Sequence, residues 1–139
     1  MNHDKTVSPR VVATDTHRSI ENPSEDALHD LLADMNLSVP FVIVDRFDSS
    51  EPGDHFIQVH LDEAVDPQRG HGYIVEFRDG GPESHFRATV SDTTPWDAIS
   101  SPAFDTVVNV IQDWAFGRGG WRTALSWEPL DFDARAADR

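Results

Sequence analysis

Seven polar side chains lie on one side of three predicted strands and form the group in this sequence with the most capacity for chemistry. The strands are predicted over residues 55–61, 73–78 and 85–90, where side chains alternate between the two faces of a sheet. The seven are Gln58, His60, Glu76, Arg78, His85, Arg87 and Thr89. Together they offer a carboxylate, two imidazoles and two guanidiniums, which acid–base catalysis and charge stabilisation require.

Two chemical interpretations follow from these residue types. In a small hydrolase or nuclease, Glu76 would act as the base and His85 or His60 as the acid. Arg87 would then stabilise developing negative charge. Alternatively, His60, Glu76 and His85 supply a His₂Glu ligand set, which is adequate for zinc with an open fourth position. The sequence contains no HExxH or paired-histidine motif, so we expect no metal and no other cofactor.

A structural interpretation of the same residues is favoured over both. Opposite charges placed across antiparallel strands stabilise the solvent face of a sheet by roughly 0.2–1 kcal/mol per pair, and they need no activity to explain them. The chain has 25 Asp and Glu residues against 11 Lys and Arg, which gives a formal charge of −14. Such a field repels nucleic acid and anionic membranes, and it disfavours a nuclease.

The charge and the polar face together predict a protein-binding surface. A basic protein is the simplest partner for so acidic a chain, although the same charge is typical of very soluble or salt-adapted proteins. The predicted binding residues are Gln58, His60, Glu76, Arg78, His85, Arg87 and Trp121. The sequence leaves the oligomeric state and the identity of the partner open.

Four tryptophans lie in the last third of the chain: Trp96, Trp114, Trp121 and Trp127. We expect most of them in the core, because Trp114 lies beside the apolar stripe of a predicted helix and Trp127 alternates with Leu125. An exposed tryptophan would mark a binding patch, since aromatic residues concentrate at interface hot spots.

Two amphipathic helices must position these strands. The first is predicted over residues 23–35, where Asn22-Pro23-Ser24-Glu25 supplies start signals and the apolar stripe is Leu28, Leu31, Leu32 and Met35. The second is predicted to begin at Ser101-Pro102 and to end before Gly117. Its apolar stripe consists of Phe104, Val107, Val108, Ile111 and Ala115.

Four short runs between the helices have strand character, over residues 41–47, 55–61, 73–78 and 85–90. Short turn-like segments join them, so we expect an antiparallel meander. The side that should face the helices carries Ile57, Val59, Leu61, Tyr73, Val75, Phe77, Phe86, Ala88 and Val90. After Gly119-Gly120, alternation over residues 121–127 predicts a further strand.

The sequence therefore predicts a single α+β domain with an antiparallel sheet of about four to five strands packed against two amphipathic helices. Residues 1–20 are expected to form a disordered or loosely attached arm, residues 21–132 the domain, and residues 133–139 a frayed tail. The chain has no cysteine, which excludes disulfides and thiolate chemistry. Its first twenty residues lack an apolar signal segment, and a cytoplasmic location is expected.

One stretch near the C-terminus combines a helix end, glycines and a closing tryptophan: Asp113-Trp114-Ala115-Phe116-Gly117, Gly120-Trp121 and Leu125-Ser126-Trp127-Glu128. It resembles the C-terminal part of the Imm1-type immunity proteins of bacterial polymorphic toxin systems. The resemblance is confined to the C-terminal third, and Gly119-Gly120 stand where that family usually has a proline. It implies a small cytoplasmic protein that binds and neutralises a cognate toxin, with no catalytic residues. A secretion-chaperone-like acidic dimer and a small hydrolase remain the alternatives.

Overall fold

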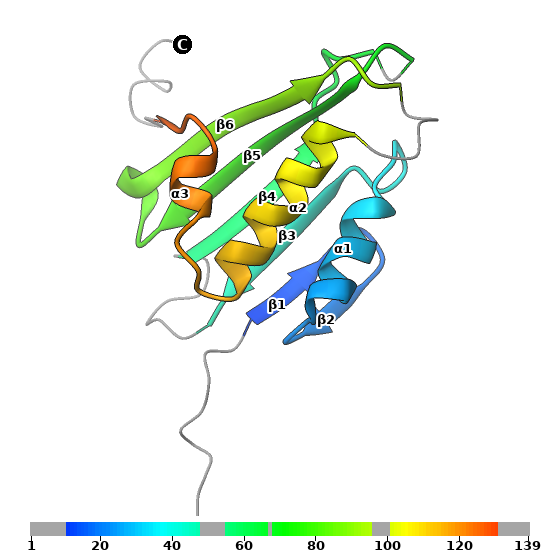
Figure 1. The fold of residues 1–139 in the computed structure, drawn as a ribbon. Helices are drawn as coiled ribbons and strands as arrows, with labels where there is room; N and C mark the ends of the chain where they lie inside the picture. The colour runs from blue at the N-terminus through cyan, green and yellow to red at the C-terminus, as the bar shows by residue number, and fades with distance from the viewer. Residues whose placement is uncertain (1–10, 48–54, 67, 96–100, 131–139) are drawn as a thin grey trace, which may run out of the picture.

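The structure, a computed structural model of the chain, describes residues 11–47, 55–66, 68–95 and 101–130. Within these ranges the chain forms one seven-stranded antiparallel sheet and three α-helices (Figure 1). The helices lie on the same side of the sheet, so the fold is α+β, as predicted. The sheet has more strands than the four to five expected.

The strand order is β2-β1-β3-β4-β5-β6-β7, with every neighbouring pair antiparallel. The strands are β1 (Val11–Thr14), β2 (Ser19–Glu21), β3 (Phe41–Arg46), β4 (His55–Leu61), β5 (His71–Asp79), β6 (His85–Asp92) and β7 (Glu128–Pro129). A 3-10 turn, η1 (Pro82–Ser84), joins β5 to β6. The four predicted central strands are confirmed as β3 to β6, and β5 and β6 extend beyond their predicted ends.

The N-terminal strands correct the expected loose arm over residues 1–20. β1 lies in the sheet between β2 and β3, and Val11 and Ala13 are buried in the core. The turn between β1 and β2 is closed by the Asp15 carboxylate, which accepts hydrogen bonds from the amides of His17 and Arg18. Strands of three and four residues show too little alternation to be recognised. Residues 1–10 and 133–139 lie outside the described part.

The second helix begins at the predicted Ser101-Pro102, whereas the first, predicted over residues 23–35, is shorter at both ends and has Ser24 as its N-cap. In α1 (Glu25–Ala33) the Ser24 hydroxyl accepts from the Ala27 amide at 3.0 Å, and in α2 (Pro102–Ala115) the Ser101 hydroxyl accepts from the Phe104 amide at 3.1 Å. These bonds satisfy amides that have no partner inside the first turn. Gly117, just past the end of α2, has φ +74°, a conformation that glycine adopts without strain.

Asp92, at the end of β6, also holds the start of α2, a role that no pattern in the sequence indicated. Its carboxylate accepts hydrogen bonds from the Ser101 hydroxyl at 2.6 Å and from the amides of Ala103 and Thr94, each at 2.8 Å. Burial acts to raise the pKa of Asp92, but these hydrogen bonds outweigh it and lower the pKa to about 2. The sheet therefore holds the start of the helix directly.

The segment after α2 differs from the predicted strand over residues 121–127. It contains the short helix α3 (Trp121–Ala124), and the strand pairing is confined to β7. The rings of Trp121 and Trp127 both lie 4.7 Å from the ring of Phe77, and 6.0 Å from each other. Six residues of extended strand would separate them by about 20 Å. Packing both tryptophans edge-on against one phenylalanine therefore requires a turn.

The core lies between the helices and one face of the sheet. Its fully buried side chains include Val42 and Val44 of β3, Ile57 and Val59 of β4, Val75 of β5, and Val107 and Ile111 of α2. The apolar face predicted from strand alternation is thus the face that meets the helices.

Ile111→Ala is expected to lower the free energy of unfolding by roughly 2–5 kcal/mol, because it removes a fully buried side chain and leaves a cavity. Asn109→Ala, on the exposed side of the same helix, should change it by less than about 0.5 kcal/mol. Urea unfolding of the two variants and the parent checks this. Equal midpoints for Ile111→Ala and the parent would contradict the packing of α2.

Candidate functional site

The face of the sheet opposite the helices carries the predicted polar residues, as their strand pairing establishes. Gln58, Glu76 and Arg87 form one row across β4, β5 and β6. Arg78 and His85 are paired in the next row, and His60 and Thr89 both pair with Ile74 in the row on the other side. The prediction that these seven residues share a face is therefore confirmed.

Glu76 is the centre of this group. Its Oε1 lies 2.8 Å from Nε2 of His85, and its Oε2 accepts from Arg87 Nη2 at 2.9 Å and Nε at 3.1 Å. His60 Nε2 lies 3.9 Å from Oε2, which is ion-pair distance and too long for a hydrogen bond. We call these residues, with Arg78, the Glu76 cluster.

The hydrogen bonds determine which nitrogen of His85 carries the proton. Arg78 Nε donates to His85 Nδ1 at 3.3 Å. A guanidinium has no acceptor, so Nδ1 must accept, and the proton of the neutral ring is on Nε2. That proton is donated to Glu76. Both nitrogens of His85 are thus engaged inside the protein, where the residue is only 3% exposed.

The same neighbours determine the charge state of Glu76. His60 is the largest cause that lowers the pKa of its carboxyl, burial opposes it, and the hydrogen bonds from His85 and Arg87 lower it further, to about 2. In return, Glu76 raises the pKa of His60 above its ordinary value, against the opposing effect of burial. Glu76 is therefore an anion throughout the physiological range.

This geometry favours neither chemical interpretation of the cluster. A carboxylate with a pKa of about 2 is a weak base at neutral pH, where a general base works best with a pKa near the operating pH. Both of its oxygens are already bonded to His85 and Arg87. Among the described residues, no group of His, Asp and Glu side chains is arranged to hold a metal ion.

The cluster is more deeply buried than a solvent-facing sheet surface, which corrects the structural interpretation in part. Glu76 is 8% exposed. The ring of Phe56 lies 5.7 Å from that of His85 and 5.5 Å from the Arg78 guanidinium, so it covers part of the pair. The strand alternation that places Gln58 on this face places Phe56 there as well, so the cover could have been predicted from the same pattern. The buried hydrogen bond between His85 and Glu76 should therefore stabilise the sheet more than a solvent-exposed charge pair does.

Trp121 does not belong to this surface, contrary to prediction. It is 6% exposed and packs on Phe77, on the face covered by the helices. Trp114 is also buried and Trp127 is partly buried against the core. These three agree with the core placement expected for most tryptophans, while Trp96 lies outside the described residues.

Comparison of the chain with protein-family models, with curated proteins and with solved structures finds no match in any of the three. None of the described helices is long and apolar enough to cross a membrane.

Glu76→Gln is expected to destabilise the protein by about 2–3 kcal/mol at pH 7, because the folded-state pKa of about 2 lies well below the ordinary value of 4.5. A lowered folded-state pKa contributes stability that is present above pH 4.5 and lost as the pH falls through about 2. The difference between parent and variant should thus shrink between about pH 5 and pH 2.

Urea unfolding at several pH values measures this difference. Glu83→Gln is a matched control, because Glu83 is an exposed carboxylate on η1, and it should change stability by less than about 0.5 kcal/mol at each pH. A Glu76→Gln penalty that stays constant down to pH 2 would show that the carboxylate charge contributes nothing.

Proposed function

We propose that the chain is a non-catalytic binding protein that acts on a basic protein partner, and that this partner is a cognate toxin. The observation that carries the proposal is the placement of the acidic residues. The Glu76 cluster combines one carboxylate with two arginines, so the excess negative charge lies elsewhere. Exposed carboxylates lie on α1 at Asp26 and Asp30, and in the loop after β4 at Glu63, while Glu25 of α1 is paired with Arg118.

The internal pairing of the Glu76 cluster supports a binding role over an enzymatic one. Its acid and base groups are bonded to one another, and the side chains of His60 and Arg87 remain about one-third exposed, at 34% and 38%. Half-buried Ile43, Phe56 and Ile74 share this face. A mixed surface of apolar side chains and oriented donors is typical of protein interfaces.

The assignment of the partner as a toxin rests on the resemblance of the C-terminal third to Imm1-type immunity proteins. A toxin that grips nucleic acid presents a basic surface, and a chain with a charge of −14 is complementary to it. An immunity role would place the protein in the cytoplasm of the cell that makes the toxin. An acidic chaperone dimer would share the charge but not the inhibition of a partner's activity.

The test is purification of the protein with its bound partner from the native cell, followed by association kinetics at low and high salt. The association rate constant is expected to fall at least about tenfold between roughly 0.05 and 0.5 M salt, with a smaller change in the dissociation rate, because screening weakens the long-range approach most. The partner's toxicity should be abolished at one equivalent of this protein.

Three outcomes would count against the proposal. The absence of any stable protein partner would remove the binding role. An association rate that ignores salt would discard the electrostatic mechanism. A hydrolytic activity that Glu76→Ala abolishes in a still folded protein would favour the enzymatic alternative.

A further inference from the structure

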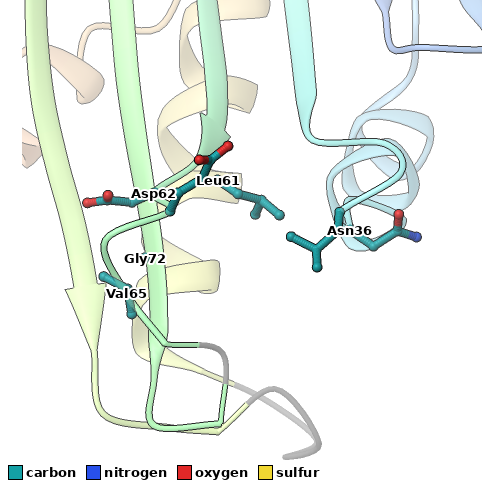
Figure 2. Close-up of a pocket in the computed structure, with 7 residues that line it drawn as sticks. Asn36, Leu61, Asp62, Val65 and Gly72 are labelled. Carbon is teal, nitrogen blue, oxygen red and sulfur yellow. The ribbon is translucent and has the colours of Figure 1, made fainter.

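An apolar pocket of about 490 Å³ lies at one end of the sheet, between the turn that follows α1 and the loop that joins β4 to β5. Its apolar lining comes from Leu37, Leu61 and Val65, and carboxylates come from Asp62 and Glu63. Figure 2 shows Leu61 projecting from the end of β4 into the space that faces the turn carrying Asn36. The Glu76 cluster contributes no residue to this lining.

The first wall is a tight turn that holds a leucine in solvent. The side-chain oxygen of Asn36 accepts hydrogen bonds from the amides of Ser38 at 2.7 Å and Val39 at 3.0 Å. The backbone groups of Asn36 and Val39 are also bonded to each other. Leu37, at the tip of this turn, is 79% exposed, more than Phe47 and Phe116, the other exposed large apolar side chains in the described part of the chain. The turn therefore presents an apolar side chain that the fold does not use.

The second wall is equally well defined. The Asp62 carboxylate accepts from the Ala64 amide at 3.0 Å, and the Val65 amide donates to the Asp62 carbonyl at 3.0 Å. Val65 then lies against the start of β5, where a Cβ on Gly72 would come within 2.4 Å of its side chain. Only glycine permits this approach. The pocket is thus shaped by backbone hydrogen bonds before any ligand binds.

The charge beside the pocket selects the chemistry of its occupant. Glu63 is exposed and Asp62 is half-buried, and within the described part of the chain neither forms an ion pair. Anionic ligands are repelled by these carboxylates and by the net charge of −14. An apolar floor with an acidic margin instead matches a peptide segment in which an apolar side chain is flanked by lysine or arginine.

We infer that this pocket is the docking site for an apolar anchor residue of the basic partner, with neighbouring cationic residues paired to Asp62 and Glu63. This inference rests on the proposed function and identifies the part of the surface at which the partner binds. The anchor buries against Leu37, Leu61 and Val65, and the flanking charges orient the segment. Affinity then requires both the apolar contact and the charges.

Three short peptides test the chemistry without knowledge of the natural partner. The first has a central leucine with two lysines on either side, the second replaces the leucine by serine, and the third replaces the lysines by glutamates. The leucine–lysine peptide should shift the amide resonances of Leu37, Asp62, Glu63 and Val65. The serine peptide should bind at least about tenfold more weakly, and the glutamate peptide should not bind.

Matched variants of the full chain isolate the two contributions. Leu37→Ser should weaken the leucine–lysine peptide about tenfold with no loss of thermal stability, because Leu37 is exposed. Phe116→Ser, an exposed aromatic at the end of α2, is its control and should leave binding unchanged. Asp62→Asn with Glu63→Gln should also weaken binding, whereas Glu83→Gln should not. The side-chain oxygen that Asp62→Asn retains can still accept from the Ala64 amide, so the loop keeps its shape.

Several results would overturn the inference. Equal binding of the leucine and serine peptides would mean that general charge attraction is sufficient. Equal binding of a small uncharged apolar molecule would mean that the carboxylates are irrelevant. A dimer that Leu37→Ser dissociates would identify a second copy as the occupant.

Binding of the captured partner to the same variants distinguishes failure of this inference from failure of the proposed function. A partner whose association is steeply salt-dependent but insensitive to Leu37→Ser and to Asp62→Asn with Glu63→Gln would sustain the proposed function and reject this pocket as its docking site. Loss of partner affinity in these variants, with Phe116→Ser and Glu83→Gln unchanged, would support both.

Discussion

Val107, Val110 and Ile111 bring the apolar stripe of α2 onto the buried side of the sheet, and α1 and α3 are attached to the same layer. Because this burial supplies most of the folding free energy, it decides which face of every strand is turned inward. The opposite face is left to polar and half-buried side chains. The Ser101 and Asp92 bonds then set where the helix starts along the sheet. The two faces therefore have different tasks, one for stability and one for surface chemistry.

The Glu76 cluster depends on strand register in a way that apolar pairs do not. Glu76 meets Arg87 because β5 and β6 pair at that position, and a slip by one residue would turn the carboxylate toward the core. A buried anion without its partners is strongly unfavourable. The cluster thus makes a sheet with shifted register less stable. Its acid and base groups are bonded to one another and are therefore not available for catalysis. Among the described residues, exposed carboxylates lie outside the cluster, including those on α1 and beside the pocket.

Long periodic elements could be predicted from the sequence, and short or cooperative ones could not. The stripe of α2 and its Ser101 cap are visible in the spacing of residues, as are the alternating strands β3 to β6. β1 and β2 are held by pairing with distant β3, and α3 exists because two tryptophans pack on Phe77. Strand alternation predicted that the members of the Glu76 cluster share one face. It did not predict how far Phe56 buries them. The pocket depends on the Asn36 turn and the contact of Val65 with Gly72, which no local pattern reports.

The two outermost strands of the sheet are also its shortest. β2 has three residues and ends in Glu21, and β7 has two residues and ends in Pro129, which has no amide hydrogen to donate. An open sheet exposes backbone donors and acceptors at its margins, and long flat margins recruit other strands into aggregates. Brief margins that carry charge and proline offer such strands little to pair with. These two short strands therefore discourage growth of the sheet from molecule to molecule where they lie, while β7 covers only Phe86 and Arg87 of β6 and leaves the rest of that strand's outer side without a paired strand among the described residues.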